Sequence, residues 1–431
     1  MARKSFRDLT RAQQLARGPI DLPFLMLTLL LLAIGLLMLL SASSYAALYD
    51  PAAGYQVEDG VVQMGDALYY FKHQLIYAVL GVLVLWLVSR LDYQRWRAWA
   101  VPILCAAVVL LILVLTPFGV NVNGATRWLK LLLVVGPTYQ PSEIAKLGIV
   151  LVFAAGMSKR KNQPPRLRRK DPIWKNQLRS FLYWSDLGEL LPYVGILIVI
   201  ALLMLKEPHM SGTILVLAAA AAILFTAGIR WGWFALGGGL MGVIMALIVF
   251  VGGYNSDRIK TWLNPWWDPG DKGYQIVQSL YAVASGGLTG LGFGQSRQKY
   301  LYLPEEQNDF IFAIICEELG FIGAALIIIL FALLIIRGYW LALHARDRFG
   351  SLLIVGITTL LAVQVFLNMA VVLNVIPATG IALPFFSYGG TALLIQLAEI
   401  GIILSVSRQI PAPKKGERGR KRDKSERGVF L

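Results

Sequence analysis

The chain has 431 residues, of which 57% are hydrophobic and only 15% are charged. A soluble domain carries roughly 25% charged residues, so the composition excludes an ordinary soluble domain and predicts a protein that crosses a membrane several times. The net charge of +15 permits a nucleic-acid partner by its sign, but the distribution of the charges excludes one.

Ten apolar runs qualify as membrane spans, some only with their flanks, because a spanning helix needs about 20 mostly apolar residues. They are residues 22–44, 73–89, 99–117, 142–157, 188–205, 211–228, 232–252, 310–336, 353–376 and 390–407. The expected fold class is therefore an all-α polytopic membrane protein with about ten transmembrane helices. We expect one membrane domain at 22–408, preceded by a tail at 1–21 and followed by a disordered basic tail at 409–431.

The positive charges predict the orientation of these helices. With a cytoplasmic N-terminus, 30 of the 40 Lys and Arg residues fall in the tails and inward-facing segments, and nine fall in outward-facing segments. Inward-facing segments of membrane proteins carry such an excess. We therefore expect both termini and the basic loop 158–187 in the cytoplasm, in contact with anionic membrane lipids. The loop at 253–309, between the seventh and eighth helices, is expected outside the cell membrane.

Neither cysteine nor histidine follows a known cofactor pattern. Cys105 and Cys316 lie inside apolar runs, and the three histidines are widely spread. The sequence therefore predicts no disulfide framework, no zinc motif and no organic cofactor.

Asp309 lies at the end of the large loop and abuts the run that starts at Phe310. A carboxylate beside hydrocarbon is costly to keep ionised unless it faces water or a partner, so Asp309 is the first candidate for a functional residue. The alternative is that it only marks the membrane interface.

The same loop contains many aromatic residues, which favour the membrane interface, and a cluster of glycines at 286–294. The glycines predict a flexible or tightly turned stretch, and a phosphate-cradling loop is one interpretation of it. Arg297 and Lys299 follow it and are candidates to pair with an anionic group of a substrate.

A second cluster outside the membrane contains Arg127, Glu143 and Lys146. Glu143 and Lys146 are spaced i, i+3 and share one helical face. They form either a structural ion pair or a polar wall of a substrate cavity. The segment 377–391, which includes Ser387, is apolar and rich in Pro and Gly. We expect a re-entrant loop there, buried in protein or lining a cavity.

These motifs resemble those of the SEDS family (shape, elongation, division and sporulation), which includes RodA, FtsW and SpoVE. Within this family, the chain is most similar to FtsW and SpoVE. The similar segments are Gly124–Leu129, Gln140–Lys146, Asn264–Trp266, Asp268-Pro269, Gly273–Gln275, Gln278-Ser279, Gly290–Gly294, Leu303–Ala313, Glu317–Gly320 and Pro384–Thr391. Where many relatives have an acid, this chain has His209, so a role for an acid there does not carry over.

The resemblance implies a peptidoglycan glycosyltransferase that polymerises lipid II, an undecaprenyl-diphosphate-linked donor, at the outer face of the cytoplasmic membrane. Asp309 matches the residue regarded as catalytic, and an inverting transfer needs only this one general base. The resemblance further implies a class B penicillin-binding protein as partner and, as an aid, a divalent cation (Mg or Mn). The candidates for contacts to the substrate are Arg127, Glu143, Lys146, Arg258, Arg297, Lys299 and Ser387.

Two alternatives remain from the sequence. A flippase that moves lipid II outward would share the helices and the substrate, but it needs a polar path across the midplane of the bilayer. A non-catalytic scaffold of the division or sporulation machinery would not need Asp309 for glycan synthesis.

Overall fold

The computed structural model describes residues 19–58, 61–122, 125–129, 139–160, 186–207, 209–250 and 256–410. Most of the predicted basic loop 158–187 and of the two predicted tails lies outside these residues, so those predictions stay untested.

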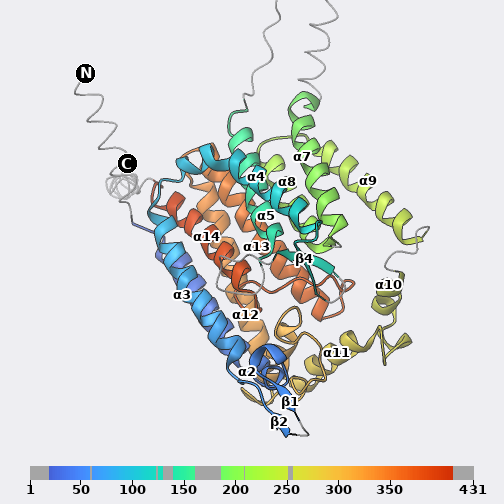
Figure 1. The fold of residues 1–431 in the computed structure, drawn as a ribbon. Coiled ribbons are helices and arrows are strands. Elements are labelled where there is room, and N and C mark those ends of the chain that lie inside the picture. The colour runs from blue at the N-terminus through green and yellow to red at the C-terminus, as the bar shows by residue number, and fades with distance from the viewer. Residues whose placement is uncertain are drawn as a thin grey trace, which may run out of the picture.

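Each of the ten apolar runs coincides with a helix (Figure 1). These helices are α2 (Leu22–Leu48), α3 (Tyr69–Arg90), α4 (Gln94–Val114), α5 (Pro141–Met157), α7 (Leu187–Lys206), α8 (Met210–Thr226), α9 (Trp231–Phe250), α12 (Ile311–Leu343), α13 (Arg348–Val372) and α14 (Gly390–Ser407). Among the described residues, seven of them are long and apolar enough to cross a membrane. The predicted class of a polytopic helical membrane protein is confirmed.

The remaining elements were not predicted individually. The segment between α9 and α12 contains α10 (Ser256–Leu263), a 3₁₀ turn η2 (Pro265–Trp267) and α11 (Tyr274–Gly286). A 3₁₀ turn η1 (Pro51–Ala53) precedes one of two short antiparallel hairpins, which are β1 (Gln56–Glu58) with β2 (Val61–Gln63) and β3 (Gly119–Val122) with β4 (Ala125–Leu129). Strands of three to five residues are too short to give a reliable alternating pattern.

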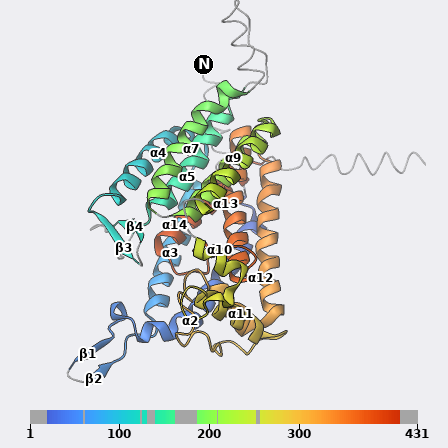
Figure 2. The ribbon, with the colours of Figure 1, turned by 90° about the vertical axis from the view of Figure 1, so that its right-hand side faces the viewer.

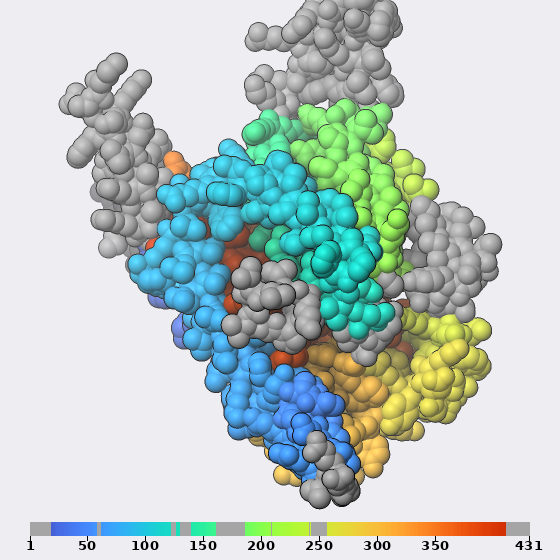
Figure 3. All heavy atoms as spheres, viewed as in Figure 1, coloured from blue at the N-terminus to red at the C-terminus, as the bar shows by residue number. Residues whose placement is uncertain are grey.

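Helix α13 forms the centre of the bundle and packs against α5, α8, α12 and α14. Most of its residues are buried, whereas α2, α3, α4, α7 and α12 leave large apolar side chains on the outside. Figures 1 and 2 show these outer helices around the central pair α13 and α14. In the space-filling view of Figure 3, α14 is visible at the floor of a hollow between α3 and the region of α4 and α5. A helix that is apolar on its outer face suits contact with lipid.

Polar side chains tie the helices together at one end of the bundle, which we call the clasped end. Arg337 pairs with Asp21 before α2, and Arg160 after α5 pairs with Asp186 before α7. Arg348 at the start of α13 donates to the carbonyl oxygen of Ala227 after α8. Arg160, Arg337 and Arg348, which the sequence assigned to the cytoplasm, therefore lie at a single end, and α10 and α11 lie at the other end (Figure 2).

Helix α12 is broken at Gly320, whose φ of 64° and ψ of −168° are not helical. The glycine-rich segment 287–292 fills the break: the backbone N–H groups of Leu291 and Gly292 donate to the carbonyl oxygens of Glu317 and Glu318 at 3.0 Å each. A Cβ atom at Gly320 would collide with the backbone of Gly290. The glycines therefore serve a close approach of two backbones, which is a structural reason for them other than the suggested phosphate loop.

Candidate functional site

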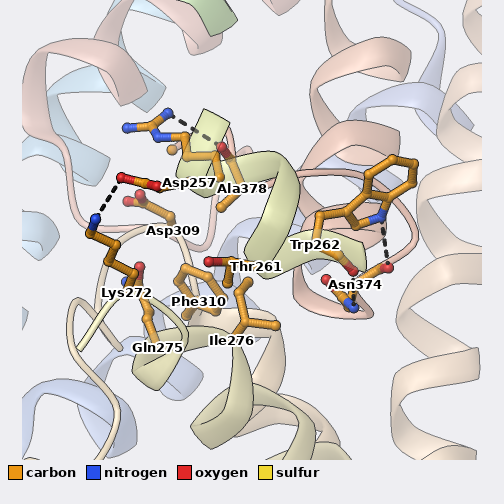
Figure 4. Close-up of a pocket in the computed structure, with 12 residues that line it drawn as sticks. Asp257, Thr261, Trp262, Lys272, Gln275, Ile276, Asp309, Phe310, Asn374 and Ala378 are labelled. Carbon is orange, nitrogen blue, oxygen red and sulfur yellow. Dashed lines mark hydrogen bonds and ion pairs between the residues drawn. The ribbon is translucent and has the colours of Figure 1, made fainter. Parts of the chain in front are cut away.

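A cavity of about 470 Å³ opens at the end opposite the clasped end. Volumes of this size are typical of sites for small ligands. Its walls come from α10, α11, the start of α12 and the segment after α13 (Figure 4). The residues that line it are Asp257, Arg258, Thr261, Trp262, Lys272, Gln275, Ile276, Asp309, Phe310, Asn374, Ala378 and Gly380.

Asp309 reaches this cavity because the backbone around it is held on two sides. The side-chain amide of Asn368 in α13 donates to the carbonyl oxygen of Asp309 at 2.7 Å. The hydroxyl of Ser387 donates to the carbonyl oxygen of Asn308 at 2.6 Å. A Cβ atom at Gly380, where φ is 66°, would lie 3.3 Å from Oδ2 of Asp309, so the absence of a side chain there leaves room for the carboxylate.

The surroundings raise the pKa of Asp309 to about 6. Burial is the main cause, and the negative charge of Glu305 adds to it, whereas Arg127 and Arg258 oppose the rise. A base whose pKa lies close below neutral pH is ionised at pH 7 and still accepts a proton effectively. The environment of Asp309 therefore suits general-base chemistry.

Charged residues gather at one side of the cavity, as Figure 4 shows for Asp257, Lys272 and Asp309. The ammonium group of Lys272 lies 2.6 Å from a carboxylate oxygen of Asp257. The guanidinium of Arg258 donates to the carbonyl oxygen of Ala378 at 3.3 Å. Two cations therefore stand beside the carboxylate of Asp309, where they can bind the phosphate groups of a ligand.

Arg127 belongs to the same electrostatic environment although it does not line the cavity. Its Nε donates to the carbonyl oxygen of Glu207 at the end of α7, at 3.4 Å, and its charge lowers the pKa of Asp309. The structure thus brings together Asp309, Arg258 and Arg127 among the predicted site residues.

Lys299 and Arg297 lie elsewhere. Lys299 is only 5% exposed, and its ammonium group pairs with Glu318 at 3.5 Å and donates to the carbonyl oxygen of Gly294 at 2.6 Å. The backbone N–H of Arg297 donates to Glu317 at 3.0 Å, and neither residue lines the cavity. Their positions show how the two glutamates of α12 fix the segment before the site.

Glu143 and Lys146 form a buried ion pair of 2.7 Å in the first turn of α5. Lys146 faces a small interior space of about 10 Å³ that is also lined by Gln364, Gln396 and Glu399. Gln396 and Glu399 of α14 are both buried in the interior. Of the two interpretations left open for Glu143 and Lys146, this geometry agrees with the structural ion pair, because neither residue lines the large cavity.

Ser387 supports the site without lining it. Its hydroxyl oxygen accepts from the N–H of Leu383 at 2.7 Å while its O–H donates to the carbonyl oxygen of Asn308. The surrounding segment is irregular and residues 383–387 are buried, in agreement with the expected protein-buried loop.

His209 stands before α8 and is buried, which lowers its pKa to about 3 and keeps it neutral. The neighbouring carboxylate of Glu207 is buried as well, and its pKa is raised to about 8. Within the described residues, neither this carboxylate nor Nδ1 of His209 has a hydrogen-bond partner.

A metal site made by protein ligands alone does not occur among the described residues, because no three His, Cys, Asp or Glu side chains come together there. A magnesium or manganese ion, however, commonly uses one or two carboxylates together with the phosphates of its substrate. Asp257 and Asp309 are the two carboxylates of the cavity that fit this manner of binding.

Sequence reasoning missed Asn368, Lys272, Asp257 and Thr261. A signal existed for Asn368, because a polar residue inside an apolar run is a candidate for an interior contact. No local pattern distinguished the other three, because they meet Asp309 only through the arrangement of α10 and α11.

The fold and cavity define a polytopic helical membrane protein with a charged site at one end of its bundle. The family described as "Cell cycle protein", which groups FtsW, RodA and SpoVE, matches residues 22–411. Stage V sporulation protein E of Bacillus subtilis is 40% identical over 90% of this chain and 97% of its own. A probable peptidoglycan glycosyltransferase FtsW of Trichlorobacter lovleyi is 39% identical over 92% of this chain and 96% of its own.

Solved structures agree with these relatives. A chain of a peptidoglycan synthase complex that coordinates polymerisation and crosslinking matches with a TM-score of 0.66 and 27% identity, over 91% of this chain and 99% of that one. The rod shape determining protein RodA of Thermus thermophilus matches with a TM-score of 0.59 and 26% identity, over 91% and 98%. The chain belongs to the family of FtsW, RodA and SpoVE, as the sequence resemblance predicted.

Proposed function

We propose that this protein is a peptidoglycan glycosyltransferase that polymerises lipid II by an inverting transfer, with Asp309 as the general base. The observation that carries the proposal is the cavity itself, where a carboxylate with a pKa of about 6 stands beside two cationic side chains. The relatives named as glycosyltransferases support it, since this chain spans nearly their whole length.

In the proposed reaction, Asp309 accepts the proton of the 4-hydroxyl group of the acceptor sugar. The oxygen of that hydroxyl forms a bond to the anomeric carbon of the donor, and the bond from this carbon to the lipid diphosphate breaks. Arg258 and Lys272 line the cavity and offset the negative charge that develops on the leaving diphosphate. The positive charge of Arg127 supports the ionised form of Asp309.

A divalent cation held by Asp257 and Asp309 together with the diphosphate would add further positive charge to the leaving group.

The polyprenyl chain of the substrate explains why the cavity belongs to a membrane protein. We place the cavity at the extracytoplasmic side, because the basic residues of the clasped end are those that the positive-inside rule assigns to the cytoplasm. We further propose a class B penicillin-binding protein as the partner. A structural relative that belongs to a complex for polymerisation and crosslinking supports this assignment.

The test is polymerisation of labelled lipid II by purified protein, with and without its partner, followed by separation of the glycan products. Asp309→Asn is expected to abolish the products. Asp66→Asn is the matched control, because it removes an exposed carboxylate that pairs with Lys72 and does not line the cavity.

Full activity of the Asp309→Asn variant would remove Asp309 from its role. A wild-type protein that moves labelled lipid II across vesicle membranes without forming polymer would identify a flippase. Absence of both activities would favour the scaffold.

A further inference from the structure

The uncharged side of the cavity contains two buried polar atoms with no hydrogen-bond partner in the described part of the chain. They are Oγ1 of Thr261 in α10 and Oδ1 of Asn374 after α13. Thr261 is only 5% exposed, and both residues line the cavity. A buried polar group without a partner is costly, so such atoms at the wall of a cavity indicate hydrogen bonds to a ligand.

The geometry fixes what each atom can do. The side-chain Nδ2 of Asn374 donates to the carbonyl oxygen of Trp262 at 3.2 Å, and the indole Nε1 of Trp262 donates to the carbonyl oxygen of Asn374 at 3.2 Å. One N–H of Nδ2 is engaged in this reciprocal pair and fixes the orientation of the amide, and Oδ1 of Asn374, which can only accept, is the atom without a partner among the described residues. The hydroxyl of Thr261 is able to donate.

Apolar side chains surround these two atoms. Ile276 is 4% exposed and Phe310 is 1% exposed, and both line the cavity together with Trp262. Figure 4 shows Thr261 and Phe310 between the charged residues and the pair of Trp262 and Asn374. This side of the cavity therefore offers one donor, one acceptor and an apolar wall.

We infer that this side of the cavity, which we call the amide subsite, binds the acetamido group of a sugar in the substrate. An acetamido group has an N–H for Oδ1 of Asn374, a carbonyl oxygen for the hydroxyl of Thr261, and a methyl group for the apolar wall. A sugar hydroxyl would satisfy either polar atom but would leave the apolar wall unused.

The inference rests on the proposed function and extends it. The repeating disaccharide of peptidoglycan carries one acetamido group on each sugar, so both sugars are chemically suitable. The charged side of the cavity binds the diphosphate and holds the base, and the amide subsite selects N-acetylated sugars.

The experiment compares Thr261→Val with wild type on natural lipid II and on two analogues, each lacking the acetyl group on one of its two sugars. Valine keeps the shape of threonine and removes the hydroxyl. On natural lipid II, Thr261→Val is expected to lower kcat/KM about tenfold, mainly through KM, as loss of one buried hydrogen bond does. Thr261→Ser restores the hydroxyl and is expected to restore most of the activity.

On the analogue that lacks the acetyl group bound in the amide subsite, wild type and Thr261→Val are expected to be equal. The analogue for which the difference disappears identifies the sugar. Asn374→Gly serves as a second variant, because glycine tolerates the φ of 55° at this position and keeps the backbone acceptor for Trp262. It is expected to show the same dependence on the acetyl group.

An equal loss on all three substrates, or no loss on any of them, would overturn the inference while leaving the proposed function intact. A wild-type protein that does not polymerise natural lipid II would instead refute the proposed function. If Thr261→Val does not fold, Asn374→Gly decides between these outcomes.

Discussion

The side-chain amide of Asn368 lies 2.7 Å from the carbonyl oxygen of Asp309 and 2.6 Å from that of Ile381. One buried group in α13 thus connects the backbone of the proposed base with the irregular segment that contributes Gly380 to the cavity. Asn368 does not line the cavity, so we regard it as a positioning residue.

Asn368→Ala is expected to lower kcat about tenfold or more while KM for lipid II changes little, because the base is displaced but the phosphate contacts remain. Gln94→Ala is the control, since it removes an amide that donates to Asp347 at the clasped end. Steady-state kinetics and thermal unfolding of both variants check this. A fall in unfolding temperature without a change in kcat would assign Asn368 to stability alone.

The pH dependence of kcat/KM follows from the raised pKa of Asp309. The general base must be ionised, so activity is expected to fall about tenfold per pH unit below about pH 6. Because Arg258 lowers this pKa, Arg258→Gln is expected to move the inflection to higher pH. A profile that stays flat down to pH 4.5 would contradict the assignment.

Lys272→Gln is expected to raise KM for lipid II severalfold, because it removes one of the two cations that line the cavity. Since Lys272 and its partner Asp257 are largely exposed, the unfolding temperature is expected to change little. Lys260→Gln is the matched control: Lys260 lies on α10, is exposed and is 4.0 Å from the same Asp257, but it does not line the cavity. Equal kinetic effects of the two variants would exclude a specific role for Lys272.

Gly320→Ala is expected to destabilise the protein by more than about 1–2 kcal/mol, because alanine at a positive φ is strained and its Cβ would collide with the backbone of Gly290. Gly195→Ala in α7 meets nothing within 4 Å and serves as the control. Thermal unfolding in detergent measures both. An unchanged unfolding temperature for Gly320→Ala would mean that the break in α12 is not required.

The helices could be predicted from sequence because each needs only a continuous apolar run, and all ten runs became helices. The cavity could not, because its walls come from segments as far apart as Asp257 and Gly380. The sequence alone does not distinguish Lys299 from Arg258, because both are cationic residues of the same predicted loop. The structure separates them, since Glu318 pairs with Lys299 inside the protein and Arg258 stays beside Asp309.

The contacts that join the helices differ in kind between the clasped end and the cavity. Ion pairs of Arg337 with Asp21 and of Arg160 with Asp186 join helices at the clasped end. Helix α10 is instead joined to the segment after α13 by hydrogen bonds to carbonyl oxygens, two between Trp262 and Asn374 and one from Arg258 to Ala378. Hydrogen bonds with an ionised group on both sides are the stronger kind, so the clasped end is expected to resist separation of its helices more than α10 resists separation from the segment after α13.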